Sequence, residues 1–111
     1  MEGKASIDPG LRNLAEVDRL VHEPARLMIL MVLYTVESAD FTFLVNATEL
    51  TNGNVSSHLS KLEAAGYVNI EKGYAGKKPD HCSTLQLTDK GRRAVDDYTN
   101  TMQQAMRNLA K

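Results

Sequence analysis

The chain has 111 residues, of which 42% are hydrophobic and 24% are charged, and its formal net charge is −1. This length supports one domain with a modest core, and no apolar run approaches the roughly eighteen residues of a membrane span. Residues 1–10 lack the basic start and apolar core of a secretory signal. The single cysteine cannot form an internal disulfide, which favours a reducing cytoplasm. We therefore expect one cytoplasmic domain over residues 1–111, without membrane contact.

Charge is unevenly distributed along the chain. Residues 1–50 hold four Lys or Arg against eight Asp or Glu, whereas residues 88–111 hold five basic side chains against three acidic ones. The acidic half is therefore separate from a mildly basic C-terminal part. A weak positive field of this kind predicts modest non-specific affinity for nucleic acid, with a strong salt dependence.

The N-terminal segment has the pattern of an amphipathic helix. Asp8 followed by Pro9 is typical of an N-cap with proline at the first helical position. Four apolar residues then share one helical stripe: Leu11, Leu14, Val17 and Val21. We expect a helix over residues 1–21, ended by His22 and Glu23.

Pro24 opens a second helix, which is apolar on every side over residues 27–34. Such a helix is buried all round, so we place it at the centre of the core or across a subunit contact. Four methionines lie at helical spacing: Met28, Met31, Met102 and Met106. We interpret them as core filler rather than as the lining of a ligand pocket.

The helical core is expected to continue to residue 66. Residues 38–40 end the second helix, and the alternation of Phe41 and Phe43 predicts a very short strand. A further helix is then expected to about Leu50.

A turn at residues 51–54 precedes a helix with one polar face over residues 54–65. Thr51 or Asn52 can cap this helix, and Gly66 is placed to end it as a C′ glycine. The inward face holds Val55, Leu59 and Leu62. The outward side holds Asn54, Ser57 and Lys61, with Ser56, His58 and Ser60 nearby.

Residues 67–87 have the pattern of a β-hairpin packed on one side. Two pairs of apolar residues alternate with polar ones: Val68 and Ile70, then Leu85 and Leu87. The loop over residues 73–81 is too long for a tight turn and is rich in Gly and Lys, so we expect it to be exposed.

The last helix is expected over residues 88–111, with Thr88 as its cap and Asp89 in its first turn. About 23 residues at roughly 1.5 Å each span about 34 Å, more than a domain of this size covers alone. Five residues follow a 3, 4, 3, 4 spacing typical of a heptad seam: Val95, Tyr98, Met102, Ala105 and Leu109. We expect these residues to form a homodimer interface.

These elements predict a mainly helical α+β fold, a winged helix-turn-helix with a long C-terminal dimerisation helix. The sequence resembles the small one-domain winged-helix transcriptional regulators of archaea and bacteria, relatives of the MarR and ArsR groups. Four strings carry the resemblance: HEPARL at 22–27, NVSSHLSKLEAAGYV at 54–68, GKKP at 76–79 and LTDKGR at 87–92. It covers about residues 15–98.

The resemblance implies sequence-specific binding of double-stranded DNA by a homodimer that regulates transcription, more often as a repressor, at a near-palindromic operator. Asparagine can pair with adenine, serine can bond to most base edges, and hairpin lysines can contact phosphates. The DNA-binding candidates are Asn54, Ser56, Ser57, His58, Ser60 and Lys61 on the recognition helix, and Lys72, Tyr74, Lys77 and Lys78 on the wing.

Other chemistries have little support in the sequence. A zinc site needs three or four converging ligands, whereas His58, His81 and Cys82 include two strand neighbours that point to opposite faces. No phosphate-binding glycine loop, paired carboxylates or supported Ser-His-Asp set occurs, so we expect no enzyme activity, cofactor or metal. No pattern points to a particular small-molecule effector. Two alternatives stay open: a winged-helix protein-interaction or dimerisation module without strong DNA binding, and a metal- or thiol-responsive sensor.

Overall fold

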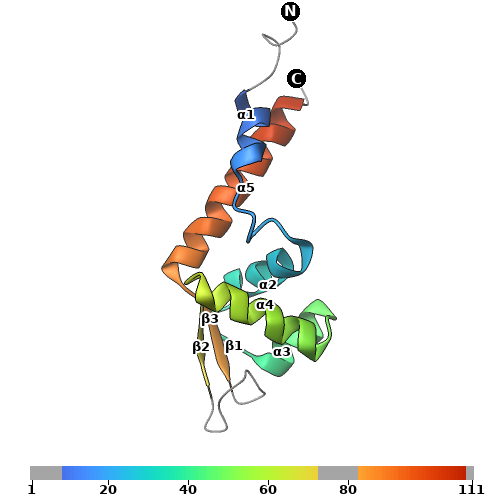
Figure 1. Cartoon of the computed structure of the whole chain (residues 1–111), viewed down its shortest axis with the longest axis vertical. Coiled ribbons are helices and arrows are strands. Elements are labelled where there is room, and N and C mark those ends of the chain that lie inside the picture. Colours follow the sequence, from blue (N-terminus) through green and yellow to red (C-terminus); the bar gives the residue numbers. More distant parts are fainter. Residues whose placement is uncertain (1–8, 73–82, 110–111) are drawn as a thin grey trace, which may run out of the picture.

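In the computed structural model, which describes residues 9–72 and 83–109, an arm made of both ends of the chain projects from a winged-helix body (Figure 1). The arm consists of α1 (Pro9–Arg12), the 3₁₀ turn η2 (Asn13–Glu16) and the C-terminal half of α5 (Asp89–Leu109). The molecule is elongated, with principal extents of 62, 23 and 23 Å. Among the described residues, no helix has both the length and the apolar character needed to cross a membrane.

The N-terminal helix is shorter than the sequence pattern predicts. Helical structure ends with η2 at Glu16, so the prediction of a helix over residues 1–21 is wrong beyond that point. A carboxylate oxygen of Asp18 accepts hydrogen bonds from the amides of Leu20 and Val21, at 2.8 and 3.3 Å. These local bonds give the backbone an alternative to the helical ladder. Asp8, the expected N-cap, lies outside the described residues.

Helix α2 (Pro24–Tyr34) begins at the proline, as predicted. Its N-cap is Glu23, whose carboxylate accepts a 2.7 Å hydrogen bond from the amide of Arg26. The inward face is buried through Ile29, Leu30 and Leu33, but the side chains of Met28 and Met31 are exposed. The helix is therefore not buried all round within one chain. Met106 is exposed as well, so three of the four methionines are surface residues rather than core filler.

The short strand and the helix after it begin earlier than expected. Strand β1 is Ala39–Asp40, and Phe41 already starts helix α3 (Phe41–Thr48). The reason is a cap, because a carboxylate oxygen of Asp40 accepts a 2.7 Å hydrogen bond from the amide of Phe43. The expected strand at Phe41 and Phe43 is thus wrong by two residues.

The sheet has three antiparallel strands in the order β1-β3-β2. Strand β2 (Val68–Glu71) and strand β3 (Thr84–Leu87) form the predicted hairpin, with Val68 opposite Leu87 and Ile70 opposite Leu85. Its inward residues join a core whose fully buried side chains include Val21, Ile29, Leu30, Leu44, Val55, Leu59, Leu62 and Leu85.

The start of α5 is clamped to the turn that follows α4 (Asn52–Ala64). The Thr88 hydroxyl accepts a 2.9 Å bond from the Gly91 amide, which confirms the predicted cap, and donates a 2.6 Å bond to the Gly66 carbonyl. A Cβ at Gly91 would lie only 2.2 Å from the Tyr67 carbonyl oxygen, so glycine is needed for this approach. The start of α5 is therefore in direct backbone contact with the turn that follows α4.

The residues of the expected dimer seam are mostly covered by their own chain. Val95, Tyr98 and Ala105 are buried within the single chain, and Met102 is half-buried. Helix α5 packs against α1, η2 and α2, which accounts for this burial. Leu109 is the seam residue that stays exposed, at 68%, and its neighbour Met106 is 65% exposed. Only part of the predicted seam is therefore exposed in the described residues, and its role in a homodimer stays a prediction.

Candidate nucleic-acid interface

Helix α4 crosses the front of the winged-helix body (Figure 1). It begins two residues earlier than predicted, because the Thr51 hydroxyl accepts a 3.1 Å hydrogen bond from the Asn54 amide and caps it. Its inward residues, Val55, Leu59 and Leu62, have no exposed surface. Gly66, with φ of 84°, ends the helix region in the left-handed conformation predicted for it. Packing and both ends therefore fix which face of α4 points outward.

The outward face of α4 is polar and exposed. Four of the six helix candidates are exposed: Asn54, Ser57, Ser60 and Lys61. The other two, Ser56 and His58, are half-buried. Asn54 and Ser57 lie on neighbouring turns at i and i+3, so one ligand surface can meet both.

His58 differs from the other candidates because it faces its own chain. Its Nδ1 lies 3.3 Å from Nη1 of Arg26 at the start of α2. The sequence pattern did not single out Arg26, although the string at 22–27 that carries the family resemblance contains it. This contact joins two segments that are 32 residues apart.

The wing is described only at its base. Lys72 follows β2 and is exposed. The candidates Tyr74, Lys77 and Lys78 lie outside the described residues, as do His81 and Cys82. Within residues 9–72 and 83–109, no group of three or more His, Cys, Asp and Glu side chains could hold a metal ion.

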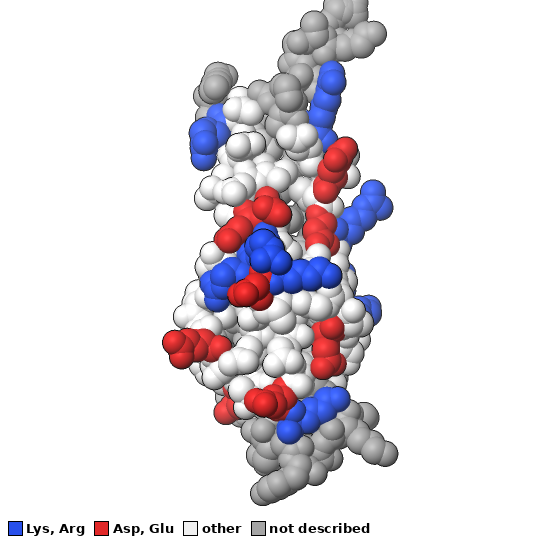
Figure 2. Space-filling view, turned by 90° about the vertical axis from the view of Figure 1, so that its left-hand side faces the viewer, with Lys and Arg blue, Asp and Glu red and all other residues white. Residues whose placement is uncertain are grey.

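The surface charge does not form a large basic patch on the face drawn in Figure 2. Lys and Arg side chains lie among Asp and Glu side chains there. A surface of this kind supplies little long-range attraction for a polyanion.

Tyr67 connects the end of α4 to the N-terminal segment by donating a hydrogen bond to the carboxylate of Asp18. Burial, followed by this hydrogen bond, raises the pKa of Tyr67 to about 12. The phenol therefore stays a proton donor at neutral pH. The turn after α4 is thus joined to the start of α5 by Thr88 and to the segment after η2 by Tyr67.

A capped helix with an exposed polar face, followed by a hairpin that pairs with β1 in a three-stranded sheet, defines a winged helix of the DNA-binding class. The chain belongs to the winged helix DNA-binding domain family, whose model matches residues 25–106. This confirms the expected fold class and the resemblance to small winged-helix regulators.

Individual relatives agree with this assignment. The chain is 31% identical over 91 residues to the uncharacterized protein MJ0432 of Methanocaldococcus jannaschii, covering 82% of this chain and 97% of that protein. A transcriptional regulator homologue from Pyrococcus horikoshii is 25% identical, with a TM-score of 0.77 over 88% of this chain and 97% of that one. A MarR-family regulator from Silicibacter pomeroyi shares the fold at 20% identity, with a TM-score of 0.65 over 90% of this chain and 65% of that one.

Proposed function

We propose that this DNA-binding transcriptional regulator acts as a homodimer that recognises a near-palindromic operator and represses transcription by covering it. The observation that carries the proposal is the outward face of α4. Its exposed side chains are Asn54, Ser57, Ser60 and Lys61, while the opposite face is fully buried. A firmly packed helix with a bare polar face is the element that winged-helix proteins place in the major groove.

Asn54 and Ser57 are the proposed base-reading residues. Both lie in the first half of α4, and an asparagine amide can bond to N6 and N7 of adenine. Lys61 lies one turn further along, where an ammonium group suits a phosphate or a guanine edge. The wing residues Lys72, Tyr74, Lys77 and Lys78 are proposed to contact the flanking backbone.

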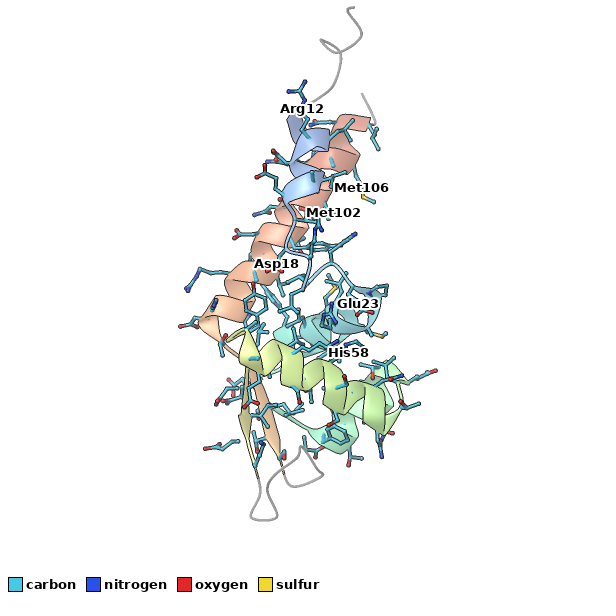
Figure 3. All side chains as sticks on the ribbon, viewed as in Figure 1. Arg12, Asp18, Glu23, His58, Met102 and Met106 are labelled. Carbon is cyan, nitrogen blue, oxygen red and sulfur yellow. The ribbon has the colours of Figure 1, made fainter. Side chains whose placement is uncertain are left out.

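Exposed apolar side chains near the free end of the arm support the homodimer. Met106 and Leu109 are both more than half exposed, and Figure 3 places Met106 on the arm, well away from α4. Large exposed apolar side chains on a small domain mark an interaction surface. A second copy is the proposed partner, because α1 and η2 pack on α5 but leave Met106 and Leu109 exposed. Met28 and Met31 on α2 are also exposed apolar side chains.

The proposed mechanism is steric. Two recognition helices related by the dimer axis enter major grooves about 34 Å apart, or a multiple of that distance. The bound dimer then covers the DNA that the transcription machinery needs. The proposed site of action is the cytoplasm, where the DNA of archaea and bacteria is found.

The test begins with selection of bound duplexes from a random DNA pool. The affinity of the selected duplex is then measured by fluorescence anisotropy over a series of salt concentrations. We expect a steep salt dependence and a two-fold symmetric selected site. The variant Asn54→Ala with Ser57→Ala should lose at least about tenfold in affinity for the selected site, with little change on random DNA. A matched control is Asn100→Ala with Ser38→Ala, which removes the same side-chain types from exposed positions away from α4.

Two outcomes would contradict the proposal. If the dimer is intact and no duplex is retained even at low salt, the chain is a protein-interaction module and the polar face of α4 serves a protein partner. If both pairs of substitutions weaken binding equally, α4 does not read the bases.

A further inference from the structure

The side chain of Arg26 connects the recognition helix to the segment in front of α2. Its Nε donates a 2.7 Å hydrogen bond to the carbonyl oxygen of Leu20, and its Nη1 lies 3.3 Å from Nδ1 of His58. Figure 3 shows His58 of α4 facing Glu23, where α2 begins. One guanidinium group therefore contacts both a fixed backbone carbonyl and the middle of α4.

The donors and acceptors of the two side chains determine which role Nδ1 of His58 takes in the contact. Arginine has only donors, so a hydrogen bond between these two groups requires Nδ1 of His58 as the acceptor. An imidazole whose Nδ1 accepts from Arg26 has that nitrogen turned inward, away from any ligand on the outer face of α4. His58 is also half-buried, unlike Asn54 and Ser57. The geometry therefore separates His58 from the direct base contacts proposed for its neighbours.

The location of His58 on α4 allows this contact to influence the orientation of the polar face. His58 follows Asn54 by four residues and precedes Lys61 by three, so all three share one flank of the helix. Val55, Leu59 and Leu62 hold the inward face through apolar packing, which is non-directional. A directional hydrogen bond on the flank adds a further restraint on rotation about the helix axis to the one that this packing supplies.

The carboxylate of Glu23 lies close enough to Arg26 to interact with its charge. Glu23 accepts the Arg26 amide at 2.7 Å, and this backbone hydrogen bond is the main cause that holds the pKa of Glu23 below its ordinary value. Glu23 therefore stays ionised at neutral pH beside Arg26 and His58.

We infer that Arg26 is a positioning residue for DNA recognition, which fixes the rotation of the recognition helix through His58 and does not itself touch DNA. The inference rests on the proposed function, because its effect on affinity is read with the selected duplex. It assigns to His58 an intramolecular role in place of a base contact.

The test is a double-mutant cycle on the full-length chain with Arg26→Gln, His58→Ala and the double variant. Each single change should weaken binding to the selected duplex by about tenfold, the equivalent of roughly 1.4 kcal/mol. The double variant should be no weaker than either single one, because both changes remove the same contact. The salt dependence should be unchanged. Arg19→Gln, which removes an equal charge from an exposed position nearby, should have little effect.

Two results would overturn the inference. If the two losses add in the double variant, Arg26 does not act through His58. If Arg26→Gln lowers the salt slope by about one, Arg26 contacts a phosphate directly. His58→Asn is the rescue variant, since its amide oxygen can accept the bond near the position of Nδ1. It should keep most of the affinity, and a loss equal to that of His58→Ala contradicts the positioning role.

A measurement without DNA separates this inference from the proposed function. The ¹⁵N NMR signals of the His58 ring should show an unprotonated, hydrogen-bonded Nδ1 in the unmodified chain and should shift in Arg26→Gln. Unchanged signals mean that the contact is absent in solution, whether or not DNA binds. If no duplex is selected but the shift occurs, the proposed function fails while the contact stands. If Arg26→Gln does not fold, the affinities of His58→Ala and His58→Asn for the selected duplex test the inference instead.

Discussion

Nδ1 of His22 lies 2.7 Å from the hydroxyl oxygen of Tyr98, and the centroids of the two rings are 5.6 Å apart. His22 belongs to the segment before α2, and Tyr98 lies in the middle of α5. The contact therefore attaches the long helix to the chain that leads into the winged-helix body. Tyr98 has the spacing of a dimer-seam residue, but its surface is used within its own subunit.

We predict that the exposed end of the arm, which includes the seam residue Leu109, holds two subunits together. Met106→Glu combined with Leu109→Glu should weaken the dimer by about 100-fold or more, because two unpaired charges would be buried at the contact. Light scattering measures the mass, and circular dichroism should show that the helices remain. The matched control, Gln103→Glu with Gln104→Glu, places the same charges at exposed positions of α5 and should stay dimeric. If the Met106 and Leu109 variant stays dimeric, another surface, such as that around Met28 and Met31, holds the subunits.

Replacing Gly91 or Gly53 by alanine should change the free energy of unfolding in opposite directions. Gly91→Ala would place a methyl group 2.2 Å from the Tyr67 carbonyl oxygen and should cost about 2–3 kcal/mol or more in the free energy of unfolding. Gly53→Ala meets no atom within 4 Å in the first turn of α4. It should stabilise the protein by about 0.5–1 kcal/mol, since glycine loses more backbone entropy on folding. Urea unfolding of both variants measures the contrast, and equal effects would contradict the close approach of α5 to Tyr67.

Thr88 is predicted to stabilise the joint between α4 and α5. Thr88→Val keeps the shape of the side chain but removes the bonds to the Gly91 amide and the Gly66 carbonyl. We expect a loss of about 1–2 kcal/mol in the free energy of unfolding. Thr42→Val on the exposed surface of α3 should change it by less than about 0.5 kcal/mol. A similar loss in both variants would show that the hydroxyl bonds of Thr88 contribute nothing specific.

Tyr67 should give the folded protein a distinct alkaline titration. Its folded pKa of about 12 lies above the ordinary value of 10.0, so folding favours the protonated phenol. The resulting stabilisation is complete below about pH 10 and is lost as the pH rises through about 12. Tyrosinate absorbance should therefore show a phenol that titrates near pH 12 and is missing in Tyr67→Phe. The difference in unfolding free energy between the two proteins should shrink over the same interval, and a normal titration of Tyr67 would contradict the bond to Asp18.

Features that depend on a residue and its near neighbours in the chain could be predicted from the sequence. Thr51 caps α4, Thr88 caps α5, Pro24 opens α2 and Gly66 ends the region of α4 in the left-handed conformation. Alternation placed the inward residues of the hairpin, and helical spacing placed the buried face of α4. These are local effects, because caps, φ angles and periodicity act over a few residues.

Only part of the candidate site could be predicted from the sequence. Periodicity correctly separated the exposed face of α4 from its buried face. It could not show that His58 turns toward Arg26, because 32 residues separate the two and no spacing rule connects them. Side-chain chemistry alone allows a histidine either role.

The sequence by itself thus determined most of the helices and strands, though not all of their ends, and which faces of α4 and of the hairpin are apolar. Only the tertiary structure decided what each apolar face covers. The 3, 4 spacing along α5 is real, but Val95, Tyr98 and Ala105 are buried in their own chain, where α1, η2 and α2 pack on α5. An apolar stripe indicates that a surface is buried away from water. The hydrophobic effect is non-directional, so the stripe does not indicate which element or subunit covers it.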